Sequence, residues 1–533
     1  MHKKQWQAVC GFIVDGCESV ADSGRTMKDL YRIITEQKDS ALFCVERNGH
    51  TIPVRRDEFH RKTVSVAKRI QENIDESHKL ICLHMESGFE WAVIFWGILM
   101  SGHIPVIFDP KNELFYYRNL PNAEEAYCIS REKNYPKAIE PEILLEDPIE
   151  MDAAFFDSSW TDEVVFISKD SSQKIRGIIY NGYTLSEQVL RLKRVYRYNA
   201  AMLYPPAFGR MKLLLGLPLY DFFGFVMGML LYPLFGGEVY LKSSAENGTD
   251  ILKRCKDSSV THMCIDGKTC NYISEAISQR IKKNFPRHYK HLMGWLTGTE
   301  RINDFRILSR YAAIALKIKK VILGNNLRCI LSTDENMNGY VPRALSQLGI
   351  YFGKGYCNTE AGLATMELSP DPAFRSKNSV GTVLDGISAR TDENGFLIFK
   401  SACFERCRLL GSKEKLADTV KIERKTSIDA SKRIHIEKTS ADQNESDVIT
   451  DPKLIIKVRD LYAAVLNRPK EMIGENMDFF SELGGDSLTY FLLLQHIEVT
   501  FGVNILPEDR KYMITVRYAA ETLKNYQITE ASK

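Results

Sequence analysis

Residues 478–488, Asp-Phe-Phe-Ser-Glu-Leu-Gly-Gly-Asp-Ser-Leu, decide how the last part of this chain folds. Gly484 and Gly485 permit a tight turn, because glycine has no Cβ to forbid a positive φ. Asp486 and Ser487 then precede an apolar run, a pattern that is typical of a helix start. A carboxylate at Asp486 also suits the positive end of a helix dipole. The stretch therefore predicts that Ser487 lies exposed at the start of a helix, where a partner can reach it.

Helical patterns flank this turn on both sides. Residues 452–467 carry apolar side chains at helical spacing, namely Leu454, Val458, Leu461 and Val465. After the turn, the pattern predicts a second helix to about Val499 and then a last apolar stripe through Val516, Ala519, Ala520 and Leu523. We therefore expect residues 452–533 to form a small helical bundle.

This predicted bundle resembles an acyl or peptidyl carrier domain, on the motif Gly484-Gly485-Asp486-Ser487-Leu488. In that family a phosphopantetheinyl transferase moves 4′-phosphopantetheine from coenzyme A to the serine hydroxyl, and the terminal thiol carries an acyl group as a thioester. The resemblance implies a four-helix bundle, a phosphopantetheine cofactor on Ser487 and that transferase as a partner. An ordinary helix cap would also explain Gly-Asp-Ser, but the flanking helical patterns favour the carrier domain.

Composition limits the function classes of the whole chain. A length of 533 residues predicts several domains, and 44% hydrophobic with 26% charged residues is typical of a soluble protein. A net charge of +3 gives no support for a nucleic-acid surface. Two long apolar runs, residues 91–108 and 213–236, are broken by Pro105, Pro218 and Pro233 and are too short to cross a bilayer. We expect a cytoplasmic protein with neither nucleic-acid nor membrane partners.

The long N-terminal part alternates predicted strands and helices. A hairpin over residues 40–56 is followed by a helix to about Ile74, a strand from Leu80 and a buried helix that ends near Met100. Further strands are predicted at 104–108, 164–167, 212–218, 238–241, 261–264 and 327–332, with a helix at 184–197. Such alternation predicts an α/β domain with a parallel sheet.

About residues 25–410 of this part are similar to the adenylate-forming superfamily, which includes acyl-CoA synthetases, luciferases and peptide-synthetase adenylation domains. The similarity rests on Glu90 to Pro110, Leu217-Pro-Leu-Tyr with Pro233-Leu-Phe-Gly-Gly, Tyr356-Cys-Asn-Thr-Glu-Ala-Gly and Val380-Gly-Thr-Val-Leu-Asp-Gly. Members use ATP and Mg²⁺ to activate a carboxylate and then pass the acyl group to a thiol. The resemblance implies an adenylate-forming-type domain with mixed or parallel sheets at 1–410, a polar linker at 411–451 and the carrier domain at 452–533.

The nucleotide motifs of that superfamily are only partly present. The resemblance implies that Thr359 holds phosphate, Glu360 helps to bind Mg²⁺ and Tyr356 lies against adenine. A Thr-Glu cap at a strand-to-helix turn is the alternative without a ligand. In the phosphate loop, Lys169-Asp-Ser-Ser-Gln-Lys-Ile-Arg-Gly177 keeps Ser171, Ser172 and Arg176 as candidate ATP-binding residues. Asp170 and Gln173 stand where the family has glycines, and both changes are expected to weaken ATP binding.

Two further departures concern catalysis. Gly182 and Asp221 stand where the superfamily usually has histidines. Between Phe404 and Asp451 the chain has no room for the mobile second subdomain of the enzymes or for its lysine. A separate protein that supplies this subdomain is one explanation.

Two functional hypotheses follow for a carrier-bearing, adenylation-like protein. As an enzyme, it would be an acid–thiol ligase that adenylates a carboxylic acid and loads its own Ser487-linked thiol. Alternatively, the front part is a non-catalytic pseudo-adenylation domain that acts as a docking scaffold, and the carrier is loaded in trans. Both place the protein in a nonribosomal peptide or polyketide type of secondary metabolism, with a downstream synthase, condensing enzyme or acyltransferase as partner.

Overall fold

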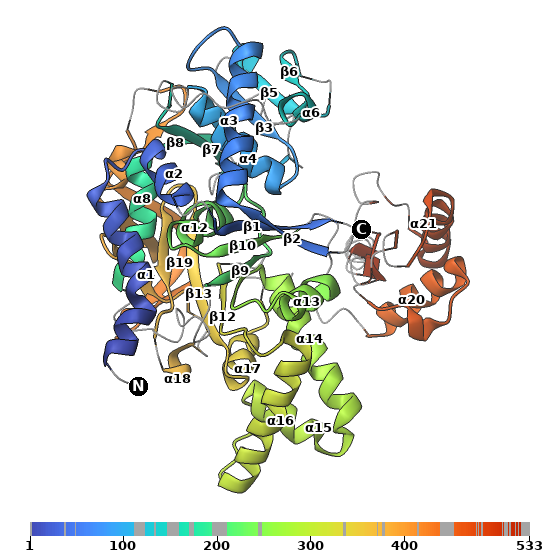
Figure 1. Ribbon diagram of the computed structural model, residues 1–533. Helices are drawn as coiled ribbons and strands as arrows, with labels where there is room; N and C mark the ends of the chain where they lie inside the picture. The colour runs from blue at the N-terminus through green and yellow to red at the C-terminus, as the bar shows by residue number, and fades with distance from the viewer. Residues whose placement is uncertain are drawn as a thin grey trace. The chain divides into compact units, whose positions relative to one another are not determined.

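The computed structural model (Figure 1) forms two compact units, Met1–Glu437 and Lys438–Lys533. It describes residues 3–36, 39–47, 50–110, 123–132, 135–146, 159–169, 175–194, 210–242, 248–333, 337–369, 371–375, 379–412, 415–436, 452–475, 477, 479–480, 483–503, 505, 510, 513–516, 519–520 and 522–523.

Among the described residues of the first unit, nine strands form one mixed sheet in the order β15-β14-β13-β12-β11-β9-β10-β1-β2. The strands from β13 to β1 all run parallel, and β14, β15 and β2 pair antiparallel at the edges. The bounds are β1 Ala41–Arg47, β2 His50–Arg55, β9 Lys212–Leu215, β10 Glu238–Leu241, β11 His262–Cys264, β12 Cys329–Ser332, β13 Tyr351–Asn358, β14 Gly362–Met366 and β15 Thr382–Val383. The predicted hairpin and the predicted strands near residues 212, 238, 262 and 329 are confirmed.

A second described sheet has seven strands in the order β18-β8-β7-β4-β3-β5-β6. The strands from β7 to β6 run parallel, and β8 and β18 add antiparallel pairs at the other edge. Their bounds are β3 Leu80–His84, β4 Ile104–Ile107, β5 Tyr127–Ser130, β6 Ala138–Ile139, β7 Glu163–Lys169, β8 Ile175–Asn181 and β18 Arg408–Leu409. The two parallel sheets confirm the predicted α/β class.

The helix α4 (Phe89–Met100) lies in the core that the two sheets share. Every residue from Trp91 to Met100 is buried, and one hydrophobic cluster joins this helix to Phe43 on β1 and Ile81 on β3. Trp91 and Phe95 stack with their rings 5.5 Å apart. An apolar run in which every face is buried needs no amphipathic pattern. Among the described helices, none combines the length and apolar character that crossing a bilayer requires.

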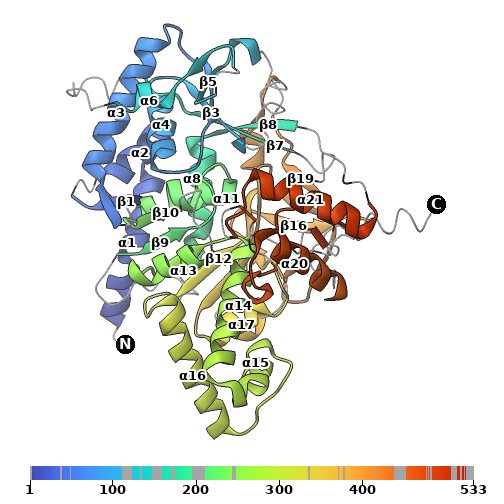
Figure 2. The same cartoon turned by 90° about the vertical axis from the view of Figure 1, so that its right-hand side faces the viewer.

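The remaining helices of the first unit cover the sheets. Residues 213 and 215 of β9 belong to the shared core, whereas Leu214 points into a second cluster under helices α13 to α17, as strand alternation requires. The bounds are α1 Lys3–Asp22, α2 Met27–Thr35, α3 Arg56–Asn73, α6 Pro141–Leu144, α8 Gly182–Leu190, α11 Phe222–Phe225, α12 Tyr232–Leu234, α13 Gly248–Asp257, α14 Gly267–Asn284, α15 Tyr289–Thr297, α16 Phe305–Leu323, α17 Val341–Gln347 and α18 Pro372–Arg375. Figures 1 and 2 show α14, α15 and α16 projecting from the sheets at the end opposite to α3.

A four-stranded antiparallel sheet corrects the predicted linker of residues 411–451. It consists of β16 Ser388–Thr391, β17 Phe396–Lys400, β19 Thr419–Ile428 and β20 Ile434–Ile436. Residues 419–436 are therefore part of the folded unit. Their polar composition is that of a strand with one solvent face, because Val420, Ile422 and Ile434 are buried with Leu397 and Phe399. Residues 437–451 lie outside the described part of the chain.

A buried ion pair ties this small sheet to the nine-stranded sheet. Arg433, next to β20, donates from Nε to Glu367 Oε2 at 2.8 Å and from Nη2 to Oε1 at 3.4 Å. Glu367 directly follows β14, and both side chains are buried. The guanidinium also lies 3.8 Å from the centre of the Phe374 ring. The ion pair therefore holds the start of β20 against the end of β14.

The second unit is helical, as predicted. Helix α20 spans Pro452–Leu466, a 3-10 turn spans Lys470–Met472 and α21 spans Ser487–Phe501. Residues 516, 519, 520, 522 and 523 are also helical. One cluster packs Val458 and Tyr462 of α20 against Leu493 and Ile497 of α21, together with the predicted stripe Val516, Ala519, Ala520 and Leu523. The helical pattern of the sequence is thus confirmed as the core of this unit.

His103, between α4 and β4, is expected to make the first unit sensitive to acid. Its side chain is buried, and Nδ1 accepts a hydrogen bond from the Lys79 backbone N–H at 3.3 Å. Burial, with a smaller contribution from His78, lowers the pKa of His103 from 6.5 to about 4. Between these values the unfolded chain binds more protons, so stability is present at neutral pH and is lost as the pH falls through this window.

We expect His103→Asn, which retains a hydrogen-bond acceptor, to remove this contribution. The loss of unfolding free energy on acidification should shrink by up to about 3 kcal/mol, because each unit of pKa shift corresponds to about 1.4 kcal/mol. Urea titrations of wild type and variant at neutral and acidic pH measure the difference. An identical acid loss in both proteins contradicts the assignment to His103.

Candidate functional site

The turn before α21 brings Gly484, Gly485, Asp486 and Ser487 together as the sequence predicts. Gly484 has a φ of 66°. A Cβ on Gly485 would stand 2.2 Å from the Phe479 ring, and the Gly485 N–H donates to the Phe479 carbonyl at 2.8 Å. One glycine is therefore required by its backbone conformation and the other by close approach. Since Phe479 is buried in the core of the unit, the turn is fixed to that core.

Asp486 caps helix α21, and Ser487 is its first residue. The Asp486 carboxylate accepts from the Thr489 backbone N–H at 2.8 Å, and Thr489 Oγ1 accepts from the Asp486 N–H at 2.8 Å. These hydrogen bonds, the backbone one first, lower the pKa of Asp486. The predicted position of Ser487 at a helix start is confirmed.

Apolar side chains surround the start of this helix on its exposed face. Leu488 is 71% exposed, and Phe491, Leu492 and Val499 are also exposed on α21. The buried face is equally apolar and contains Leu493, Leu494 and Ile497. An apolar exposed face of this kind is typical of a surface that contacts other proteins.

The candidate nucleotide-binding residues come partly together in the first unit. The Tyr180 hydroxyl on β8 donates to the Thr359 carbonyl at 2.8 Å, which joins β8 to the turn between β13 and β14. Arg176 lies on β8 and Glu360 lies in that turn. Ser171 and Ser172 lie outside the described residues. A strand follows Thr359 and Glu360, so the alternative of a cap at a strand-to-helix turn is wrong.

Two of these residues form an ion pair with each other. Arg176 Nη1 lies 3.5 Å from Glu360 Oε1, with the arginine half exposed and the carboxylate mostly buried. Phosphate would need the arginine and Mg²⁺ would need the carboxylate, so either ligand must compete with this contact. Tyr356 is partly buried, with its ring centre 5.8 Å from that of Phe399, and its hydroxyl accepts from Asn358 Nδ2 at 3.1 Å.

Gly182 and Asp221, the two residues that stand where the resemblance predicts histidines, have structural roles. Gly182 starts α8, and a Cβ there would stand 2.4 Å from the backbone N of Met27 at the start of α2. The Asp162 carboxylate accepts from the N–H groups of both Met27 and Gly182, at 2.7 and 3.2 Å. Asp221 caps α11 by accepting from the Gly224 N–H at 2.8 Å. The N-terminal helices therefore occupy the space next to residue 182.

A cleft of about 540 Å³ opens at the carboxyl ends of strands from both parallel sheets. α/β folds commonly bind ligands at such strand ends. Burial and the nearby Asp109 raise the pKa of Tyr220 in this cleft to about 12. The Leu217–Tyr220 loop of this cleft belongs to a motif recognised in the sequence, whereas the charged residues of the lining were not predicted. These charged residues are Glu86, Arg131, Glu132, Lys242 and Asp266. Each follows a strand by one or two residues, and this position in the sequence could have indicated them.

Comparison with known proteins identifies the second unit. Residues 457–509 match the family model of the phosphopantetheine attachment site. An acyl carrier protein of Lactobacillus johnsonii is 27% identical over 79 residues, which are 15% of this chain and 99% of that protein. The cofactor of this unit is accordingly 4′-phosphopantetheine. The glycine turn and the start of α21 fit that group, because a phosphodiester on the first helical residue lies at the positive end of the helix dipole.

Solved structures identify the fold of the first unit. The N-terminal subdomain of Klebsiella oxytoca NpsA, in complex with 3-hydroxyanthranilyl-AMSN, aligns with a TM-score of 0.55 at 11% identity and covers 78% of this chain and 100% of its own. The N-terminal domain of Mycobacterium tuberculosis FACL13 gives 0.56 at 11% identity, covering 78% and 100%. The nonribosomal peptide synthetase FmoA3 gives 0.53 at 14% identity, covering 93% of this chain and 50% of its own. The first unit thus has the fold of these N-terminal domains, and the second unit matches the phosphopantetheine attachment site.

Proposed function

We propose that this protein carries an acyl or aminoacyl group for a nonribosomal peptide or polyketide type of assembly, with Ser487 as the attachment site of phosphopantetheine. One observation carries the proposal: Ser487 is the first residue of a capped helix that follows a turn in which both glycines are required. When attached, the cofactor supplies a terminal thiol that holds the acyl group as a thioester.

The residues around Ser487 have separate tasks in this proposal. Asp486 fixes the first turn of α21 through Thr489, so that residue 487 is presented in one backbone conformation. The exposed apolar residues Leu488, Phe491 and Leu492 supply the contact surface for partner enzymes. A phosphopantetheinyl transferase and a downstream synthase, condensing enzyme or acyltransferase are the partners that such a surface serves.

For the first unit, a specific contact favours a scaffold over an adenylating enzyme. The Arg176–Glu360 ion pair uses the two charged side chains that ATP and Mg²⁺ would require. The sequence also has no room for the second subdomain of the superfamily, so the lysine that this subdomain supplies is missing as well. Electrostatic stabilisation is usually the largest contribution to such a reaction, and the loss of one donor costs about 3–4 kcal/mol. We therefore propose that the carrier is loaded in trans.

Mass spectrometry of the intact chain tests the carrier proposal. The protein is incubated with coenzyme A and a broad phosphopantetheinyl transferase, and then with ATP, Mg²⁺ and a mixture of amino and fatty acids. We expect a mass increase at the first step and none at the second. No increase at the first step contradicts the carrier proposal, whereas an ATP-dependent acyl mass at the second step contradicts loading in trans.

Thermal unfolding tests ATP binding independently. We expect no change in the melting temperature of the full chain when ATP and Mg²⁺ are added. A site that is occupied at a hundred times its dissociation constant would stabilise the fold by about 2.7 kcal/mol. A clear ATP-dependent shift that disappears in Glu360→Gln would show that the ion pair yields to the nucleotide, and the scaffold proposal would then fail.

A further inference from the structure

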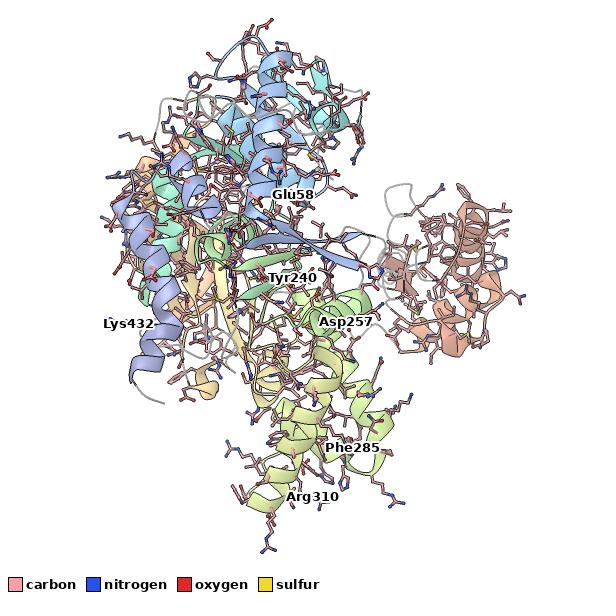
Figure 3. The ribbon with its side chains drawn as sticks, in the orientation of Figure 1. Glu58, Tyr240, Asp257, Phe285, Arg310 and Lys432 are labelled. Carbon is pink, nitrogen blue, oxygen red and sulfur yellow. The ribbon has the colours of Figure 1, made fainter. Side chains whose placement is uncertain are left out.

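Helices α14 to α16, residues 267–323, form a projecting part of the first unit that we call the basic lobe. It contains twelve lysines and arginines but only three acidic residues, in a chain whose totals are 71 and 68. Eleven of the twelve basic side chains are exposed, and Lys319 is buried. Figure 3 shows Arg310 near the far end of this lobe. The near-neutral charge of the whole chain therefore conceals a strongly basic surface.

The few acidic residues of the basic lobe do little to neutralise it. Asp304 caps α16, accepting from the backbone N–H of Arg306 at 2.7 Å and of Ile307 at 3.4 Å. Glu300 lies 2.7 Å from His291. Helix α16 itself contains no acidic residue over its 19 positions. Its outer surface therefore presents positive charge along its whole length, from Arg306 to Lys320.

Large apolar side chains lie on the same outer surface. Phe305 is 78% exposed and Leu316 is 53% exposed. They lie about three turns apart on the same side of α16. Ile307 and Val321 are also exposed, but on the other side of the helix. The opposite face of the helix, with Tyr311, Ala315, Ile318 and Leu323, is buried in the lobe. These exposed residues are therefore not needed for the packing of the helix.

We propose that α16 docks the protein on an anionic lipid surface. Its arginines and lysines would contact phosphate and carboxylate headgroups, while Phe305 and Leu316 would enter the boundary between headgroups and acyl chains. The combination of positive charge with exposed phenylalanine and leucine on one helix is typical of interfacial membrane binding. The proposal departs from the sequence-based expectation of no membrane partner, which rested on spanning segments and on net charge.

The apolar residues favour lipid over the other polyanions. Single-stranded nucleic acids are usually held by stacking on several aromatic rings, and Phe305 is the sole aromatic residue among the exposed positions of α16. An acidic protein would need a shaped apolar contact, whereas hydrocarbon accepts Phe305 and Leu316, which lie on one side of α16, without a shaped pocket. The projection of the lobe away from the sheets also leaves α16 accessible to an extended surface (Figures 1 and 2).

Co-sedimentation of the full chain with vesicles tests this proposal. We expect binding to phosphatidylcholine vesicles that contain phosphatidylserine and none to phosphatidylcholine alone, with affinity that falls as salt is raised. Lys317→Glu/Lys320→Glu should weaken binding at least about tenfold. Phe305→Ser leaves the charge unchanged and should weaken binding severalfold, since it removes the inserted ring.

A matched charge reversal elsewhere on the first unit provides the control. Lys425→Glu/Lys432→Glu changes the charge by the same amount at two exposed positions, and Figure 3 shows Lys432 well away from Arg310. This variant should bind vesicles like wild type. The lipid proposal is overturned if both double variants lose the same affinity for anionic vesicles. It is also overturned if Phe305→Ser binds these vesicles as tightly as wild type. Binding to polyglutamate but not to anionic vesicles overturns it in favour of an acidic protein partner.

Discussion

Replacement of Ser487 by alanine is expected to abolish attachment of phosphopantetheine to the full chain. Alanine has no hydroxyl group to accept the phosphodiester. The helix should remain intact, because alanine is the best helix former and Asp486 still caps the first turn through Thr489. Intact-mass measurement after incubation with coenzyme A and a transferase should therefore change from complete modification to none.

Thr500→Ala is a matched control for this experiment. It removes a hydroxyl group from an exposed position at the other end of α21 and leaves the glycine turn untouched. The control should be modified like wild type. If Ser487→Ala retains the mass increase, another side chain carries the cofactor and the assignment of Ser487 fails. Equal circular dichroism of the two variants excludes unfolding as the cause of a loss.

Arg433→Met is expected to destabilise the first unit by about 3–5 kcal/mol, because it leaves the Glu367 carboxylate buried without its partner. The Glu367 side chain is 3% exposed, so water cannot replace the guanidinium. The methionine retains much of the apolar stem that packs on Phe374. The midpoint of urea unfolding, followed by tryptophan fluorescence, measures the loss, since the described tryptophans that are buried belong to this unit.

An exposed ion pair in the same small sheet gives the comparison. Lys400 Nζ lies 2.9 Å from Asp418 Oδ2, and its side chain is 64% exposed. Lys400→Met should shift the unfolding midpoint far less than Arg433→Met does, as is usual for a surface pair. Glu367→Met/Arg433→Met should recover part of the loss, because it removes both buried charges. Similar effects of Arg433→Met and Lys400→Met would show that burial of the Glu367–Arg433 pair is unimportant.

Local patterns made the carrier domain readable in the sequence. Gly484, Gly485 and Asp486 act within a few residues of Ser487, so the turn and the cap are encoded where they are used. Strands such as β3, β4 and β9 were equally readable, because strands buried on both faces are short continuous apolar runs. Strands β5 and β13 were not predicted. Strand β19 was missed for the opposite reason. Among its described residues, Val420 and Ile422 are the buried apolar ones, and their partners Leu397 and Phe399 are distant in sequence.

The candidate nucleotide site and the basic lobe show two further limits of the sequence. Arg176 and Glu360 are 184 positions apart, and their ion pair depends on the contact of β8 with the β13–β14 turn. No local sequence pattern predicts a contact between residues so far apart in the chain. The charge of residues 267–323, in contrast, was present in the sequence, but it was cancelled in the total of +3 by acidic residues elsewhere. Charge counted segment by segment would have found it.

The contact at Gly182 also bears on how this chain could change over evolution. Any side chain at residue 182 would meet the backbone of Thr26 and Met27, both 2.4 Å from the position of a Cβ. A single Gly182→His mutation would therefore displace the start of α2. Residue 182 can therefore accept a larger side chain only together with changes in the N-terminal helices that contact it.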